Sequence, residues 1–263
     1  MNLLRTCHYP PDEALLTAAD ELEMFVECEA PFCWAPGRGH TELVCRTTAE
    51  MVLACRNHPS VLFWSLANES HWGDDFMASS RLARTLDPTR PQTFNWTSNR
   101  IQTVEEGFTD IANIHYPAHD GPAQTRKYTK RPVYLGEDCH LNAYNRLELA
   151  TDPALRDLWG RYTREMWDDL YETAGSLGQS IWAGIDDTFY MKDDRTVGYG
   201  TWGPLDGWRR AKPEFWGMKK AYSPVRLDEK SGFKISPDGG IEIPVVNRNN
   251  FSNLGEMKID WRL

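Results

Sequence analysis

The chain has 263 residues, of which 41% are hydrophobic and 25% are charged, a composition typical of globular proteins. Its net charge is −9 and no basic cluster occurs, which argues against nucleic acids and anionic membrane surfaces as partners. No apolar run is long enough to cross a bilayer, and the first residues lack the apolar region of a signal peptide.

The aromatic and cysteine contents narrow the function classes only slightly. The chain has 11 tryptophans, which suit either a carbohydrate site or a large aromatic core. The six cysteines form no CxxC pair and no regular spacing, so zinc and redox motifs are unsupported. We expect buried thiols, and the sequence leaves a disulfide between some pair open.

Apolar runs alternate with amphipathic segments over the first 222 residues. The predicted strands are 2–10, 24–29, 61–69, 92–96, 111–116, 132–137 and 178–186. The predicted helices are 12–23, 47–56, 74–86, 153–173 and 213–222, with a short, weak helix within 122–130. Successive strands begin about 20 to 45 residues apart, with helical segments between most of them, as in βα units.

Polar or aromatic residues collect at the carboxyl ends of these strands. They are His8, Glu29, Asn68, Glu69, Trp96, Tyr116, Glu137, Trp182 and Asp186. This pattern predicts an α/β fold of the (β/α)8 TIM-barrel type, in which functional side chains line one face at the strand ends. A doubly wound open sheet is the alternative, but it would require a glycine-rich phosphate loop after a strand, and the sequence has none.

The pattern changes at Ser223. Helical spacing stops, and the stretches 233–236, 240–246 and 258–261 alternate between turn signals. They resemble the first strands of an antiparallel β-domain that is too short to close its own core. We therefore expect two domains, a barrel over residues 1–222 and the beginning of a β-sandwich over 223–263.

Two of the strands end in a glutamate. Val61–Leu66 is followed by Ala67, Asn68 and Glu69, and Val133–Leu135 is followed by Gly136 and Glu137. A buried strand rarely ends on a carboxylate for packing reasons, because a desolvated carboxylate is costly. Two such strand ends predict a cleft with paired carboxylates, as in a hydrolase.

Four stretches together resemble glycoside hydrolase family 2, the β-galactosidase-like retaining enzymes. They are residues 2–10, 58–70, 131–137 and 180–182. The resemblance implies that the chain begins at the second barrel strand, so that the first strand and helix of the (β/α)8 barrel are lacking. It also implies that an upstream segment is missing, which leaves the compartment open between the cytoplasm and the periplasm or exterior.

The resemblance assigns roles to individual residues. Glu69 is expected to be the general acid/base and Glu137 the nucleophile, two roles that retaining glycosidases require. Arg5 would keep Glu137 ionised, and Tyr116 would hydrogen-bond to the same carboxylate. The expected sugar contacts come from His8, Asn68, His140 and Trp182, with Asn68 on the 2-hydroxyl and Trp182 as an aromatic floor.

No metal and no cofactor are expected. Some family members bind magnesium just after the third barrel strand, but the corresponding positions here hold Cys33 and Ala35. The expected function is a retaining exo-β-glycosidase acting on an oligosaccharide or β-glycoside, most readily a β-galactoside. The alternatives are a β-glucuronidase or another family 2 glycosidase, and a truncated non-catalytic remnant or carbohydrate-binding fragment. Homo-oligomerisation of the full-length protein stays open.

Overall fold

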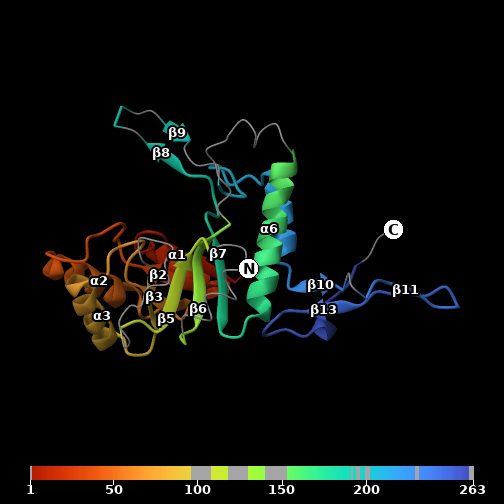
Figure 1. Ribbon diagram of the computed structural model, residues 1–263, viewed down its shortest axis with the longest axis horizontal. Helices are drawn as coiled ribbons and strands as arrows, with labels where there is room; N and C mark the ends of the chain where they lie inside the picture. The colour runs from red at the N-terminus through yellow and green to blue at the C-terminus, as the bar shows by residue number, and fades with distance from the viewer. Residues whose placement is uncertain are drawn as a thin grey trace.

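The computed structural model describes residues 2–95, 108–117, 130–139, 153–190, 192–193, 196–198, 202–228 and 231–260. Its centre is a seven-stranded sheet, in which every strand pairs in parallel with the next strand along the chain (Figure 1). The strands are β1 (Leu3–Arg5), β2 (Phe25–Glu29), β3 (Val61–Ser65), β4 (Gln92–Phe94), β5 (Ile111–His115), β6 (Val133–Asp138) and β7 (Ser176–Ile181).

The sheet curls until its two outer strands approach each other. Just beyond β1 and β7, the rings of His8 and Trp182 stack with their centroids 5.2 Å apart. An all-parallel sheet in sequential order with helical connections is the arrangement of an α/β barrel. The predicted seven-stranded α/β barrel is thus confirmed, although most strands are shorter than the apolar runs suggested.

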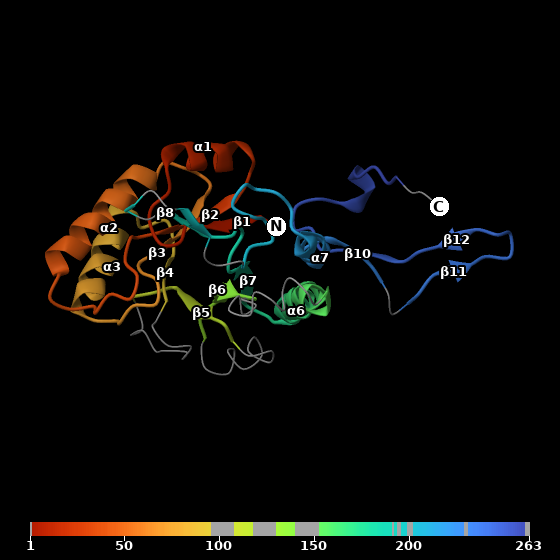
Figure 2. The ribbon, with the colours of Figure 1, turned by 90° about the horizontal axis from the view of Figure 1, so that it is seen from above.

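Helices cover the outside of the sheet (Figure 2). They are α1 (Glu13–Glu21), α2 (Thr41–Cys55), α3 (Asp74–Leu86), α6 (Pro153–Glu172) and α7 (Pro213–Ala221). Asp12 is the N-cap of α1, because its side chain accepts a hydrogen bond from the Ala14 N–H at 2.8 Å. No helix within the described ranges is long and apolar enough to span a membrane.

Helix α2 begins six residues earlier than its apolar spacing suggested. Of its first four residues only Val44 is buried, and Leu43 is exposed, so hydrophobic periodicity gave a weak signal there. Its start is fixed instead by Asp75 of α3, a side chain that is 1% exposed. Asp75 accepts from the backbone N–H of His40 at 3.1 Å and from the hydroxyl of Thr41 at 2.6 Å, so a long-range contact replaces a local cap.

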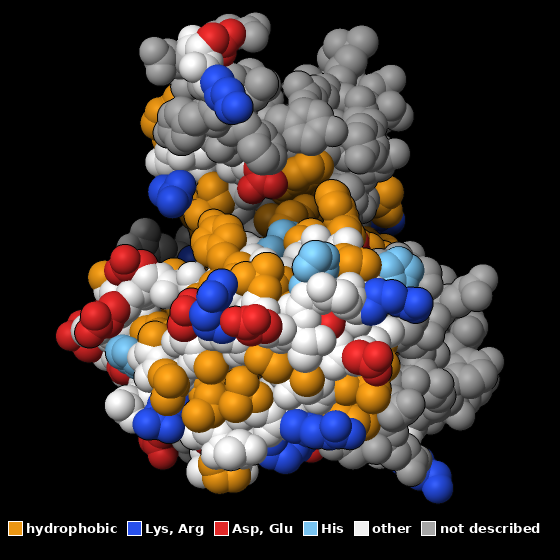
Figure 3. Space-filling model, turned by 90° about the vertical axis from the view of Figure 1, so that its left-hand side faces the viewer, with side chains coloured by type: hydrophobic (Ala, Val, Ile, Leu, Met, Phe, Trp, Pro, Cys, Tyr) orange, Lys and Arg blue, Asp and Glu red, His pale blue; other side chains and the backbone are white. Residues whose placement is uncertain are grey.

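The main hydrophobic core lies between the outer face of the sheet and α1, α2 and α3. It includes Val26, Cys28 and Trp64 from the strands, with Leu16, Val52 and Phe76 from the helices. A second core packs β5 and β6 against α6. The outer surface of the α2–α3 pair mixes apolar and charged side chains (Figure 3). Leu62 of β3, which we expected to be buried, is 40% exposed.

The segment after β7 contains regular structure that the sequence did not predict. The strand ends at Ile181 rather than at Asp186, and β8 (Thr188–Tyr190) and β9 (Thr196–Gly198) form a short antiparallel hairpin. The predicted strand-end residue Trp96 lies outside the described residues. The weak helix predicted within 122–130 also lies outside them, except for residue 130.

The C-terminal stretch extends away from the barrel (Figures 1 and 2). β10 (Val225–Leu227) pairs with β13 (Val245–Asn247), and β11 (Lys234–Ile235) pairs with β12 (Ile241–Glu242), both antiparallel. A 3-10 turn, η1, follows at Leu254–Glu256. The strand that we predicted from Lys258 is wrong over its described part, because 258–260 has no regular structure.

Candidate active site

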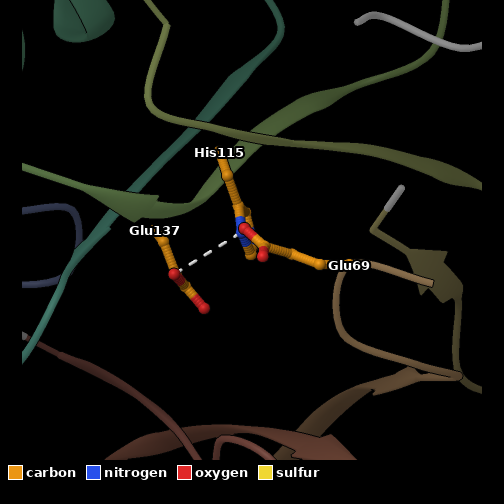
Figure 4. A group of neighbouring side chains, drawn as sticks. All are labelled: Glu69, His115 and Glu137. Carbon is orange, nitrogen blue, oxygen red and sulfur yellow. Dashed lines mark hydrogen bonds and ion pairs between the residues drawn. The ribbon is translucent and has the colours of Figure 1, made fainter. Parts of the chain in front are cut away.

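Three side chains from three strand ends meet at one face of the barrel (Figure 4). Glu69 follows β3, His115 ends β5 and Glu137 lies near the end of β6. One ligand-type atom from each of the three lies within 4.8 Å of the other two. The two glutamates that the sequence singled out are therefore neighbours across a narrow gap.

The residue before Glu137 is a glycine that packs against Asn113. The N–H of Gly136 donates to the side-chain oxygen of Asn113 on β5, at 3.0 Å. A Cβ at position 136 would lie 2.3 Å from that oxygen, so a side chain there would displace the Asn113 amide. Gly136 thus leaves room for the amide that joins β5 to β6 just before Glu137.

Arg5 organises the floor of the site. Its guanidinium contacts Glu137 Oε1 at 2.7 Å, Glu29 Oε2 at 2.8 Å and Asn68 Oδ1 at 2.8 Å. Burial by itself would lower the pKa of Arg5, but the neighbouring carboxylates raise it well above its usual value. The side chain is only 3% exposed, so Arg5 is a permanently charged, rigid anchor.

Glu137 has partners on both carboxylate oxygens. Arg5 binds Oε1, and the Tyr116 hydroxyl donates to Oε2 at 2.5 Å. Burial raises the pKa of Tyr116, and the charge of Glu137 raises it further, so the phenol stays a hydrogen-bond donor. This environment orients an ionised carboxylate and stabilises its charge.

Glu69 has a different environment. Its Oε1 lies 3.0 Å from His115 Nδ1, and its Oε2 accepts a hydrogen bond from the indole N–H of Trp34 at 3.0 Å. Burial raises the pKa of this carboxyl, but the hydrogen bonds from His115 and Trp34 outweigh it and lower the pKa. Its side chain is 24% exposed, whereas that of Glu137 is 6% exposed.

The backbone at these strand ends is unusual. Glu69, Trp34 and Tyr116 all have positive φ angles, of 37°, 56° and 48°. Such conformations are uncommon for residues other than glycine, and they cluster at functional sites. In this site Trp34 and Tyr116 each donate a hydrogen bond to one of the two glutamates.

His115 and Trp34 were missed by the sequence analysis. His115 is 2% exposed, and its Nδ1 lies between Glu69 at 3.0 Å and Glu137 Oε2 at 3.6 Å. Burial lowers the pKa of His115, so the imidazole is neutral near pH 7. His115 is a polar residue at the end of a buried strand, and that position could have predicted it. From the sequence, this strand end was assigned to Tyr116 instead.

The other predicted sugar-contacting residues lie at the same face. His8 Nδ1 contacts Glu29 Oε1 at 3.0 Å, and its ring stacks on Trp182 with an interplanar angle of 13°. The pKa of Glu29 would be raised by its complete burial, but Arg5 and His8 lower it instead. Of the residues to which the resemblance assigned a role, His140 lies outside the described residues.

The residues after β2 do not fit a magnesium site. Cys33 offers a sulfur, which accepts a hydrogen bond from Asn68 Nδ2 at 3.2 Å, and Ala35 offers no side-chain donor. Magnesium prefers oxygen ligands in octahedral geometry. Glu69, His115 and Glu137 could approach one ion, but the Arg5 cation already neutralises the Glu137 carboxylate.

The fold is thus that of a TIM-type barrel domain, with two glutamates and an arginine converging at the carboxyl ends of its strands. The family model described as "Glycosyl hydrolases family 2, TIM barrel domain" matches residues 1–137. That match covers about half of the chain, and the chain belongs to glycosyl hydrolase family 2.

Named relatives carry two activities. The β-galactosidase BgaC of Bifidobacterium adolescentis is 30% identical over 56% of this chain and 17% of its own length. A putative β-glucuronidase of Formosa agariphila is 35% identical over 34% of this chain and 13% of its own length. The solved β-D-glucuronidase of Dictyoglomus thermophilum superposes with a TM-score of 0.67 at 21% identity, over 84% of this chain and 44% of that one, and this likeness concerns the fold. The chain thus spans well under a third of the length of these curated relatives.

Proposed function

We propose that this chain carries the catalytic barrel of a retaining exo-β-glycosidase that releases a terminal β-linked sugar, with a β-galactoside as the substrate. The observation that carries the proposal is the close approach of Glu69 and Glu137, whose oxygens come within 4.8 Å. Retaining enzymes hold their carboxyl groups roughly 5–5.5 Å apart, whereas inverting enzymes need roughly 6.5–9.5 Å to fit a water molecule.

Glu137 is the nucleophile in this proposal. Its ionised Oε2 attacks the anomeric carbon as the glycosidic bond breaks, and an ester bond to the sugar forms. Arg5 and Tyr116 hold the carboxylate in place through one contact on each oxygen. The glycosyl ester is neutral, so the negative charge beside Glu69 disappears at this step.

Glu69 is the acid and then the base. In the first step its proton passes to the departing glycosidic oxygen, and in the second it takes a proton from the water that attacks the ester. In the free site the hydrogen bonds from His115 and Trp34 lower the pKa of Glu69. The charge of Glu137 opposes that effect, and its loss on ester formation favours release of the proton from Glu69. The charge on one carboxyl thereby sets the role of the other.

A neutral sugar suits the charges of this face better than a uronate does. The Arg5 cation beside Glu137 is already paired with Glu29 and Glu137. Glu69 adds a further acidic group within 4.8 Å of Glu137. The carboxylate of a uronate would meet this acidic surface, so we favour a β-galactoside over a β-glucuronide.

We also propose that the barrel occupies residues 1–222 and that 223–263 begins a β-sandwich.

The test compares the wild type with Glu137→Gln on nitrophenyl β-galactoside and nitrophenyl β-glucuronide. Glu50→Gln, on the exposed side of α2, is the control. We expect the galactoside to be the better substrate, and Glu137→Gln to lose activity by about three or more orders of magnitude. Proton NMR should detect the β-anomer as the first product. Full activity in Glu137→Gln, or an α-anomer formed first, would contradict the proposal.

A further inference from the structure

Trp34 is a large aromatic residue in an exposed position beside the candidate acid/base. It lies in the turn that follows β2, and its side chain is 73% exposed. Burying a tryptophan is strongly favourable, so an indole left in solvent beside a reactive carboxyl calls for an explanation. The indole N–H donates to Glu69, but the faces of the ring have no role in the proposed double displacement.

The backbone around Trp34 is held on both sides by the segment that carries Glu69. The Trp34 N–H donates to the Asn68 carbonyl at 3.2 Å, and the Asn68 N–H donates to the Phe32 carbonyl at 2.7 Å. One residue further on, the Ala35 N–H donates to the Ser70 hydroxyl at 2.9 Å. The turn after β2 and the end of β3 are thus joined, and Trp34 cannot shift without moving Glu69.

The indole is also fixed at its polar edge. Its N–H donates to Glu69 Oε2 at 3.0 Å, whereas Oε1 is the oxygen that contacts His115. Since His115 in turn approaches Glu137, Oε1 is turned to the side of the nucleophile, and Oε2 is turned to Trp34. In a double displacement, the sugar lies over the nucleophile and the leaving group lies by the acid.

We propose that Trp34 forms the platform of a leaving-group subsite, which binds a ring-shaped aglycone, a pyranose or an aryl group, against its open face. This inference rests on the proposed glycosidase function and specifies where its leaving group binds. A rigid, solvent-exposed indole with a satisfied N–H needs little reorganisation to accept the apolar face of a ring. The leaving oxygen then comes within reach of Glu69, while the ring attached to it stacks on Trp34.

Two substitutions separate the ring of Trp34 from its N–H. Trp34→Phe keeps an aromatic face but has no donor for Glu69, and Trp34→Ala has neither. Trp216→Ala is the matched control, because Trp216 is also exposed, at 63%, but lies on the outer helix α7. Melting temperatures establish that each variant is folded.

The substrates compare leaving groups with and without a ring. Methyl β-galactoside has no ring in its leaving group, β-galactosyl-glucose has a pyranose, and phenyl β-galactoside has an aryl group. An aromatic contact of about 0.5–1.5 kcal/mol corresponds to about two- to tenfold in kcat/KM. We expect Trp34→Ala to lose this factor on at least one ring substrate relative to methyl galactoside, and Trp34→Phe to retain most of the preference. Comparing the two ring substrates shows whether the subsite prefers a pyranose or an aryl leaving group.

Each outcome bears on a distinct claim. If Trp34→Ala lowers kcat/KM equally for the methyl and both ring substrates, the subsite is refuted while the glycosidase function stands. If Trp216→Ala reproduces the selective loss, the platform is also refuted. If the wild type hydrolyses none of the three substrates but cleaves another β-glycoside, the choice of sugar is wrong, and the same comparison is made on that sugar. If it cleaves no β-glycoside, the proposed function fails and the subsite fails with it.

Discussion

Removing one hydroxyl group, that of Tyr116, tests whether Glu137 is held as an ionised nucleophile. The phenol donates to Glu137 Oε2 at 2.5 Å, and Tyr116→Phe deletes only that donor. The ring and its edge contact with His115, at 5.9 Å between centroids, can remain. A hydrogen bond to a charged group contributes about 1.5–3 kcal/mol, so we expect kcat/KM to fall by about ten- to 150-fold.

The assay is the initial rate of nitrophenyl β-galactoside hydrolysis over a range of substrate concentrations, from which kcat and KM are obtained separately.

Tyr171→Phe is the control, because Tyr171 is 45% exposed on α6 and lies on the outside of the barrel. It should behave as the wild type does. A change of less than twofold in the kcat/KM of folded Tyr116→Phe would mean that the phenol does not stabilise the nucleophile. The assignment of Glu137 would then lose its main electrostatic support beyond Arg5.

Three further predictions concern the remaining contacts. Arg5→Met should lower both kcat and the melting temperature, because removing one partner of a buried charge network costs about 3–5 kcal/mol. Trp34→Phe should move the basic limb of the kcat/KM profile to higher pH. In the wild type the hydrogen bond from Trp34 lowers the pKa of Glu69, so Glu69 stays protonated to higher pH when that bond is lost. Asp75→Ala should destabilise the fold by about 1–3 kcal/mol, seen as a drop of about 2–4 °C in melting temperature per kcal/mol, with kcat unchanged.

The barrel could be predicted from the sequence because its strands are buried and apolar while their ends are polar. Periodicity located α3 and α6 almost to the residue, since both have a clear apolar face. The start of α2 escaped prediction, because its cap comes from Asp75, which lies more than thirty residues further along the chain. Spacing along a chain carries no information about such a contact.

The candidate site was partly predictable for the same reason. Arg5, Glu69 and Glu137 stand at strand ends and inside recognisable motifs, so their meeting at one face could be expected. Trp34 lies in a turn, and only the positive φ at that position and the pairing of the turn with Asn68 bring its indole to Glu69. Those features depend on tertiary structure and leave no periodic trace in the sequence.

The most direct test of the two-carboxylate mechanism is to trap its intermediate. A 2-deoxy-2-fluoro-β-galactoside with a good leaving group slows both steps, since fluorine destabilises the positive charge that develops on the sugar ring. Mass spectrometry of a proteolytic digest then locates the attached sugar. We expect a fluorogalactosyl ester on Glu137, and no such adduct in Glu137→Gln. A sugar attached to Glu69 or to any other residue would contradict the assignment of the nucleophile and, with it, the double displacement proposed for this pair.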